Sequence, residues 1–153
     1  MTSYYGLQQF KKLSGGKSVY AVIGNPIGHS MSAPLHKLLS EGGEYSAVLI
    51  DGDEELKDFC RYAKTNLAGF NVTIPYKKDI IKYLDKIRGI AKKTQSVNTV
   101  KNENGLLVGY NTDIYGIERA LKHNGVELSG KSALILGGGG AASAAATALS
   151  KKA

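Results

Sequence analysis

The chain has 153 residues, of which 42% are hydrophobic and 22% are charged, and this composition is typical of a folded domain rather than of a disordered segment. One cysteine, Cys60, excludes an intramolecular disulfide framework. The formal net charge of +7 is compatible with a nucleic-acid partner. However, the lysines are spread along the chain, which favours a solvated basic surface or an acidic small-molecule substrate.

No membrane segment is expected. The first residues lack the charged and then apolar pattern of a signal segment. The uncharged window 132–150 is as long as a membrane span, but four consecutive glycines interrupt it. We therefore interpret the chain as a cytoplasmic protein.

The first half of the chain predicts alternating strands and helices. Residues 1–17 form a polar lead-in with a short helix over 5–13, and the apolar run that follows predicts a buried strand. Ser32 is suited to cap a helix that has Pro34 in its first turn. The elements expected after the lead-in are a strand over 18–24, a helix over 33–40, a strand over 44–51, an amphipathic helix over 53–66 and a strand over 68–74.

The second half continues the alternation. Isoleucine and leucine at helical spacing predict a helix over 77–87. The pair Asn104-Gly105 is typical of a tight turn, so residues 98–111 are predicted to form two short antiparallel strands. A helix is expected over 113–124, and a new parallel strand over 130–137.

This order predicts an α/β fold, namely a mostly parallel open sheet with helices on both faces and an antiparallel hairpin near its edge, followed by the start of a Rossmann-like unit. We expect a lead-in over 1–17, a first domain over 18–124 and the start of a second domain over 125–153, because the strand–helix cycle restarts there. Binding residues should gather at the carboxyl ends of the strands.

Polar side chains follow the predicted strands at these ends. Ser30 and Ser32 lie two residues apart, so both hydroxyls can face a carboxylate or a polyol, although Ser32 can also be only a helix cap and Ser30 only a turn residue. Asn71 and Thr73 share the polar face of a strand. Lys77 follows them, either as a reactive amine or as a solvated lysine.

Two Asn-Thr pairs flank the predicted hairpin, the first beginning at Asn98. Their amides and hydroxyls suit a polyhydroxylated ring, whereas the plain alternative for 111–113 is a helix N-cap with Asp113 in the first turn. Near the end, Gly137, Gly139 and Gly140 allow a tight turn that brings a helix N-terminus close to a pyrophosphate.

The segments "GNPIGHSMS", "FNVTIPYK", "SVNT" and "GYNTD", in this order and spacing, together resemble the shikimate dehydrogenase family. The resemblance covers roughly residues 18–150, as the substrate domain and the first strand and helix of the NADP domain. It implies NADP-dependent, reversible reduction of 3-dehydroshikimate to shikimate, a step of aromatic amino-acid biosynthesis. It also implies a small-molecule partner and no metal, nucleic acid or membrane.

The resemblance further implies a role for each matched residue. Lys77 and Asp113 look like the catalytic pair, with the lysine giving or taking a proton at the reacting oxygen. The other matched residues are Ser30 and Ser32 for the substrate carboxylate, Asn71, Thr73 and Asn98 for the ring hydroxyls, and Gly137, Gly139, Gly140 and Ala141 for the cofactor phosphates.

Enzymes of this family continue with further strands of the cofactor domain. We therefore expect the chain to be a substrate-binding half that is inactive alone and does not bind NADP usefully. The alternatives are an NAD-using quinate or shikimate dehydrogenase and a non-catalytic shikimate-binding module, although the intact Lys77 and Asp113 argue against the latter. A nucleic-acid-binding protein comes last, because no motif supports it.

Overall fold

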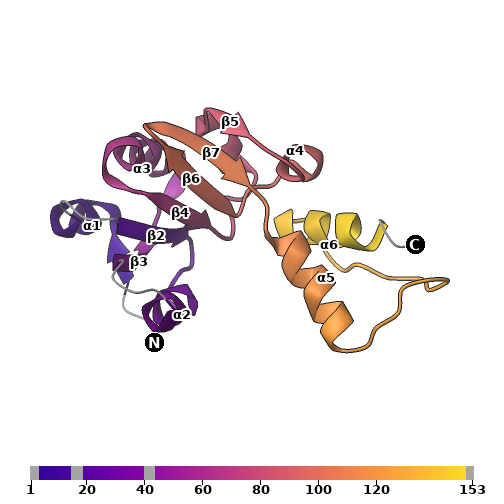
Figure 1. Cartoon of the computed structure of the whole chain (residues 1–153). Helices are drawn as coiled ribbons and strands as arrows, with labels where there is room; N and C mark the ends of the chain where they lie inside the picture. The colour runs from indigo at the N-terminus through magenta and orange to yellow at the C-terminus, as the bar shows by residue number, and fades with distance from the viewer. Residues whose placement is uncertain (1–3, 15–18, 40–43, 151–153) are drawn as a thin grey trace.

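A mostly parallel sheet forms the centre of the computed structural model, which describes residues 4–14, 19–39 and 44–150 (Figure 1). The strands are β1 (Tyr4–Gly6), β2 (Val19–Gly24), β3 (Glu44–Leu49), β4 (Gly69–Val72), β5 (Lys86–Ile87), β6 (Thr99–Glu103) and β7 (Leu106–Tyr110). Their order in the sheet is β1-β3-β2-β4-β6-β7-β5. Only β6 runs antiparallel to its described neighbours, β4 and β7. The predicted fold class is therefore confirmed.

Helices cover both faces of this sheet. The helices are α1 (Leu7–Leu13), α2 (Ser32–Leu39), α3 (Gly52–Asn66), α4 (Ala91–Thr94), α5 (Asp113–His123) and α6 (Gly140–Ser150), with a 3₁₀ helix η1 (Asp79–Tyr83). α1 and α3 lie on one face and α2 on the other, whereas α5 and α6 pack against each other beyond the end of β7 (Figure 1). No helix among the described residues is long and apolar enough to span a membrane.

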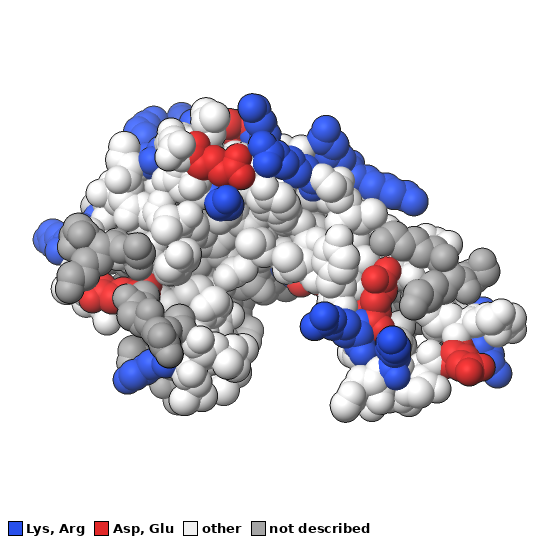
Figure 2. Space-filling model, viewed as in Figure 1, with Lys and Arg blue, Asp and Glu red and all other residues white. Residues whose placement is uncertain are grey.

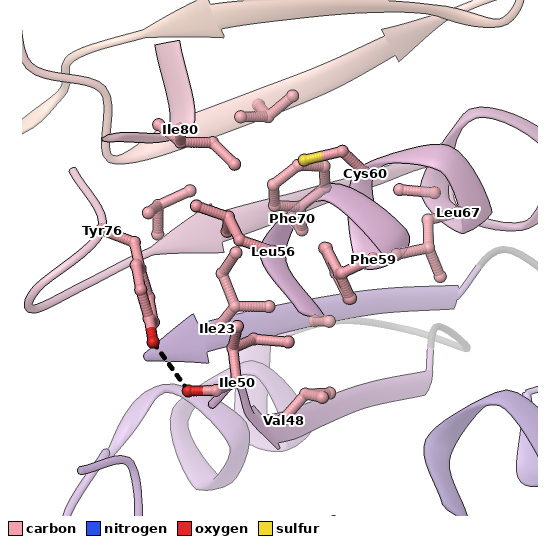
Figure 3. Packing of buried hydrophobic residues seen from close by; sticks show 14 of the residues in the cluster. Ile23, Val48, Ile50, Leu56, Phe59, Cys60, Leu67, Phe70, Tyr76 and Ile80 are labelled. Atoms are coloured by element: carbon pink, nitrogen blue, oxygen red, sulfur yellow. Dashed lines mark hydrogen bonds between the residues drawn. The ribbon is translucent and has the colours of Figure 1, made fainter. Parts of the chain in front are cut away.

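The core follows from the alternation of side chains along the strands. Ile23 and Val48 belong to the main cluster beneath α1 and α3, whereas Val22 and Ala47 face the opposite side. The apolar face of α3 predicted from helical spacing is confirmed. Its four residues are all buried, namely Leu56, Phe59, Cys60 and Ala63. Figure 3 shows part of the main cluster, including Ile23, Val48, Ile50, Leu56, Phe59, Cys60, Leu67, Phe70, Tyr76 and Ile80.

The predicted hairpin is confirmed as β6 and β7. Asn104 and Gly105 have φ values of 55° and 88°, as a type I′ turn requires at its two central positions. The side-chain oxygen of Asn102 accepts the N–H of Gly105 at 2.7 Å, which fixes the turn. The hairpin continues directly into α5 and so places the start of that helix at the sheet.

The helix predicted over 77–87 is wrong. The segment forms the short helix η1 and then β5, because the backbone from Asp85 onward bonds to β7 instead of continuing a helical ladder. The N–H of Asp85 donates to the carbonyl of Leu107 at 3.0 Å, and that of Arg88 donates to Gly109 at 2.9 Å. Ile80 is nevertheless buried in the main core, and Ile81, Leu84 and Ile87 are partly buried against it. The apolar residues of this segment therefore do face the core, although they do not form one helix.

The strand predicted over 130–137 is also wrong, since residues 131–138 have no helix or strand. A strand needs a neighbour for its backbone hydrogen bonds, and no strand of the described residues pairs with this segment. Leu134 and Leu136 are 85% and 88% exposed. The helix that follows, α6, does form.

The lead-in contributes more to the sheet than the sequence indicates. The expected short helix is confirmed as α1, but β1, which pairs with β3, was not predicted. Leu7 and Phe10 of α1 are buried in the main core. The helix predicted over 33–40 ends at Ser40, which lies outside the described residues.

Candidate active site

The register of the sheet brings the predicted polar residues together. Asn71 on β4 lies opposite Thr99 on β6, which in turn lies opposite Tyr110 at the end of β7. α5 begins just beyond, at Asp113. Figure 2 shows that the molecule is hollowed between α2 and α5. Because Ser32 begins α2 and Asp113 begins α5, residues of the predicted site lie on both elements that border this hollow.

Lys77 and Asp113 form an ion pair, as their predicted partnership requires. Nζ of Lys77 lies 2.7 Å from Oδ2 of Asp113, and the two side chains are 18% and 27% exposed. The turn that carries Lys77 is anchored beside it, because the buried Tyr76 donates its hydroxyl to the carbonyl of Ile50 at 2.8 Å (Figure 3). The carbonyl of Lys77 also accepts the N–H of Val97 at 2.7 Å.

Asn98 holds the other oxygen of the aspartate. Its Nδ2 donates to Oδ1 of Asp113 at 2.7 Å and to Oγ1 of Thr112 at 3.0 Å. Its Oδ1 accepts the N–H of Thr112 at 2.9 Å. The carboxylate of Asp113 is therefore fixed between a cation and an amide, and Lys77 is oriented through it.

Asn71 extends this network across the sheet. Its Nδ2 donates to the carbonyl of Asn98 at 3.1 Å and to Oγ1 of Thr99 at 3.2 Å. Its Oδ1 accepts the hydroxyl of Tyr45 at 2.7 Å. The amide of Asn71 thus has a fixed orientation at the end of β4.

Tyr45 was missed in the sequence and connects the serine pair to the network. It forms a side-chain hydrogen bond with Ser32, and burial raises the pKa of Tyr45 to about 12 despite that bond. Its ring stacks on His36 of α2 with centroids 3.9 Å apart. The alternation along β3 places Tyr45 on the same face as Ala47, toward α2, and this was the available signal.

Thr73 directly follows β4, whereas Ser30 lies in the loop between β2 and α2, and β2 and β4 are neighbours in the sheet. Oγ of Ser30 accepts the N–H of Ser32 at 3.3 Å, so Ser30 does take part in a turn. The N–H of Thr73 donates to the carbonyl of Ile23 at 2.9 Å. A Cβ on Gly24 would lie 2.5 Å from the methyl group of Thr73, so only glycine lets these strand ends approach.

Asn111 has the structural role that was the plain alternative. Its Oδ1 accepts the N–H of Asp113 at 3.0 Å, and its Nδ2 donates to the carbonyl of Ser96 at 2.9 Å. It therefore fixes the start of α5 rather than facing the hollow, while Asp113 remains available to Lys77.

The glycine turn lies next to the ion pair. Ala141 of α6 lines a cavity of about 440 Å³ together with Lys77 and Asp113. A Cβ built on Gly138 or Gly139 would meet nothing within 4 Å, so the turn is open on that side. In the described ranges, no group of three or more His, Cys, Asp or Glu side chains is placed to hold a metal ion.

The fold and the site together define an α/β domain with a paired lysine and aspartate beside a glycine turn that precedes a helix. The family described as "Shikimate dehydrogenase substrate binding domain" matches residues 22–100, more than half of the chain. The chain belongs to this family.

Relatives of known name agree with this membership. The chain is 46% identical over 127 residues to a shikimate dehydrogenase (NADP(+)) of Bacillus cereus strain G9842, a match that covers 79% of this chain and 46% of that protein. The crystal structure of the Thermus thermophilus enzyme in complex with NADP(H) and shikimate has a TM-score of 0.80 at 35% identity, covering 88% of this chain and 52% of that one. The Listeria monocytogenes enzyme in complex with shikimate and NAD has a TM-score of 0.76 at 39% identity, covering 90% and 49%. The chain thus spans about half the length of these relatives.

Proposed function

We propose that the chain is the shikimate-binding and proton-transferring half of an NADP-dependent shikimate dehydrogenase, which reversibly reduces 3-dehydroshikimate to shikimate. The observation that carries the proposal is the ion pair of 2.7 Å between Lys77 and Asp113, whose second oxygen is held by Asn98. In this proposal residues 18–124 bind the substrate and residues 125–153 begin the cofactor-binding domain. The named relatives support it.

Lys77 is proposed to move the proton. Reduction of a ketone leaves an alkoxide, and the ammonium of Lys77 stabilises that charge and then donates a proton to the oxygen. In the reverse direction the neutral amine accepts the proton of the hydroxyl. Asp113 keeps the amine in place in both directions, because it is itself fixed by Asn98.

The polar groups around the ion pair are proposed to bind the rest of the substrate. Ser30 and Ser32 bind the carboxylate, which their hydroxyls can reach from the start of α2. Asn71, Thr73 and Asn98 bind the ring hydroxyls from β4 and the start of β6. Since Asn71 and Asn98 are held by bonds within the protein, they meet the ring with amides already oriented.

The cofactor is proposed to bind at the turn before α6. The turn is open at Gly138 and Gly139, it precedes a helix N-terminus, and Ala141 shares a cavity with the ion pair. These features fit a phosphate-bearing cofactor. Gly137, Gly139, Gly140 and Ala141 would hold its phosphates, and NADPH, when bound, supplies the hydride.

Calorimetric titration of the chain with shikimate tests the substrate assignment. The wild-type chain is expected to bind, and Ser32→Ala is expected to weaken binding because one hydroxyl toward the carboxylate is lost. Lys101→Ala is the control for Lys77→Ala, since Lys101 is a 66% exposed lysine outside the proposed site. Equal affinities in wild type, Ser32→Ala and Lys77→Ala would contradict the assignment.

Turnover tests the proton-transfer role, measured with the cofactor-binding part of the enzyme present. Lys77→Ala is expected to lower kcat by about 10²–10⁴-fold, the range of general acid–base catalysis, and to change KM much less. A higher KM with an unchanged kcat would mean that Lys77 only binds the substrate.

The choice of cofactor has a second candidate, because the similar Listeria monocytogenes structure contains NAD. Comparison of kcat/KM with NADP and with NAD decides between them. We expect the larger value with NADP, in line with the names of the curated relatives.

A further inference from the structure

Gly140, the first residue of α6, packs directly on Lys77. A methyl group built on Gly140 would lie 3.0 Å from Cβ and 3.1 Å from Cδ of Lys77, and 2.6 Å from Oγ of Ser96. By contrast, a methyl group on Gly138 or Gly139 would meet nothing within 4 Å. The four glycines of the turn therefore do not have the same surroundings, and Gly140 is the one that closes on the ion pair.

Ser96 forms the other side of this contact. Its side chain is fully buried, and its hydroxyl has no hydrogen-bond partner among the described residues. The next residue, Val97, donates its N–H to the carbonyl of Lys77. Lys77 is therefore bounded by Asp113 at its amine, by Val97 at its carbonyl and by Gly140 along its alkyl chain.

α6 is held in this position by its own contacts. Ala144 and Ala148 of α6 are fully buried against Ile114 of α5, in a cluster separate from the main core. Nζ of Lys78 also donates to the carbonyl of Gly138 at 3.2 Å. The turn cannot retreat from Lys77 without losing these contacts.

We propose that Gly140 is a positioning residue for Lys77, in addition to the part it takes in phosphate binding. Its missing side chain lets α6 press on the alkyl chain of Lys77 and so keeps the amine on Asp113. The inference rests on the proposed function of Lys77. It predicts that a substitution in the glycine turn changes the position of Lys77 in the substrate site, even though the substituted residue does not contact the substrate.

Chemical labelling of Lys77 tests the contact without any ligand. The chain is treated briefly with an amine-reactive succinimidyl ester, and the labelling rate of Lys77 is measured by peptide mass spectrometry relative to Lys101, which is 66% exposed. Gly140→Ala is expected to raise this rate several-fold, because the methyl group displaces Lys77 from Asp113. Gly138→Ala, the matched control in the same turn, should leave it unchanged, because a methyl group there meets nothing within 4 Å.

Rescue distinguishes positioning from general damage. Ser96→Ala removes the atom nearest to the new methyl group, so the double variant Gly140→Ala/Ser96→Ala should return toward the wild-type rate. Cys60, which is buried in the main core, reports folding through its resistance to thiol reagents. If Gly140→Ala does not fold, Ala148→Glu, which loosens α6 from α5, should raise the labelling of Lys77 in the same way.

Equal labelling of Lys77 in wild type, Gly140→Ala and Gly138→Ala would overturn the inference. Shikimate titration of the same proteins separates this result from a failure of the proposed function. A wild-type chain that does not bind shikimate contradicts the proposed function, while the labelling rates still decide the role of Gly140. If the wild type binds, Gly140→Ala should bind several-fold more weakly and Gly138→Ala equally well.

Discussion

Both the nitrogen and the oxygen of the Asn98 amide make hydrogen bonds within the site. Asn98 donates to Asp113 and Thr112 and accepts the N–H of Thr112, while its backbone carbonyl accepts from Asn71. The side chain is 9% exposed, so water cannot readily replace these bonds. One residue therefore couples the aspartate of the ion pair to the strand that carries Asn71.

Substitutions of Asn98 should separate the loss of its hydrogen bonds from the effect of an added negative charge. Asn98→Ala should lower the free energy of unfolding by about 1–3 kcal/mol, because Asp113 and the N–H of Thr112 lose a buried partner. Asn98→Asp should cost more at pH 7, since it places a second carboxylate beside Asp113. Thermal unfolding at pH 7 checks both, with the exposed Asn124→Ala as the control. If Asn98→Asp were the more stable of the two, the expected repulsion between the added carboxylate and Asp113 would be contradicted.

Individual site residues could be predicted where a motif carried them. Lys77, Asp113, Asn98 and Asn71 were singled out in the sequence, and the structure brings them into one network. Tyr45 could not be found in this way, because its role depends on which residues of β4 and α2 lie beside β3. The contact between Ser96 and Gly140 likewise could not be predicted, because it depends on where α6 lies in the folded chain.

At the scale of elements, one side chain connects α3 to the hairpin. Nδ2 of Asn102 donates to the carbonyls of Ala63, Lys64 and Leu67 at 2.8–3.0 Å, and its Oδ1 accepts the N–H of Gly105. These carbonyls lie in the last turn of α3 and at its C-cap, Leu67, where a helix leaves carbonyls without a helical partner, although that of Ala63 also accepts the N–H of Leu67. Asn102 therefore ends the helix and fixes the turn together.

Asn102→Ala should lower the free energy of unfolding by about 1–3 kcal/mol, because several polar groups lose their partner at once. Asn102→Asp keeps the oxygen that accepts from Gly105, but it places a negative charge at the negative end of the helix dipole and should be no better than alanine. Denaturant unfolding measures both variants. A loss smaller than that of the exposed Asn66→Ala would show that water replaces these bonds without cost.

Asp85, which directly precedes β5, should make the free energy of unfolding depend on pH. The ion pair with Lys64 and the N–H of Leu107 hold the pKa of Asp85 below its ordinary value. Because the pKa is lower in the folded state, this stabilisation is present above the unfolded value of about 3.9 and is lost as the pH falls through the folded value.

Asp85→Asn should therefore be less stable than wild type at pH 7, and the difference should shrink as the pH falls below about 3.9. Melting temperatures measured from pH 7 to pH 2 test this expectation. Asp79→Asn, an exposed carboxylate in η1, serves as the control. A difference that stays constant down to pH 2 would show that the carboxylate charge of Asp85 contributes nothing.

Elements could be predicted where local pattern and tertiary partners agree. The Asn104-Gly105 turn and the apolar face of α3 are local features, and both were predicted correctly. The segments 77–87 and 130–137 depend on partners instead. The first pairs with β7 and loses its helix, whereas the second has no described strand beside it and stays irregular.

The whole molecule presents a basic edge on the face seen in Figure 2. Lys and Arg gather over the part of the sheet around β5 and α4. The α2 side of the hollow between α2 and α5 is largely uncharged in this view, whereas the α5 side carries both basic and acidic residues (Figure 2). The basic residues therefore do not gather at the hollow alone.

The exposed apolar segment before α6 should make the isolated chain bind hydrophobic dyes. Leu134 and Leu136 are almost fully exposed on a segment with no strand partner in the described residues. The double variant Leu134→Lys/Leu136→Lys should bind less anilinonaphthalene sulfonate than wild type and keep the same melting temperature. Unchanged dye fluorescence would show that this segment is covered in solution.

A crystal structure of the chain soaked with shikimate tests the central claim most directly. The account predicts the ring in the hollow between α2 and α5, with its carboxylate at Ser30 and Ser32 and a hydroxyl oxygen within hydrogen-bond distance of Lys77. Shikimate bound instead in the groove of about 780 Å³ lined by Tyr4, Ile27 and Met31, or no bound shikimate at a saturating concentration, would contradict it.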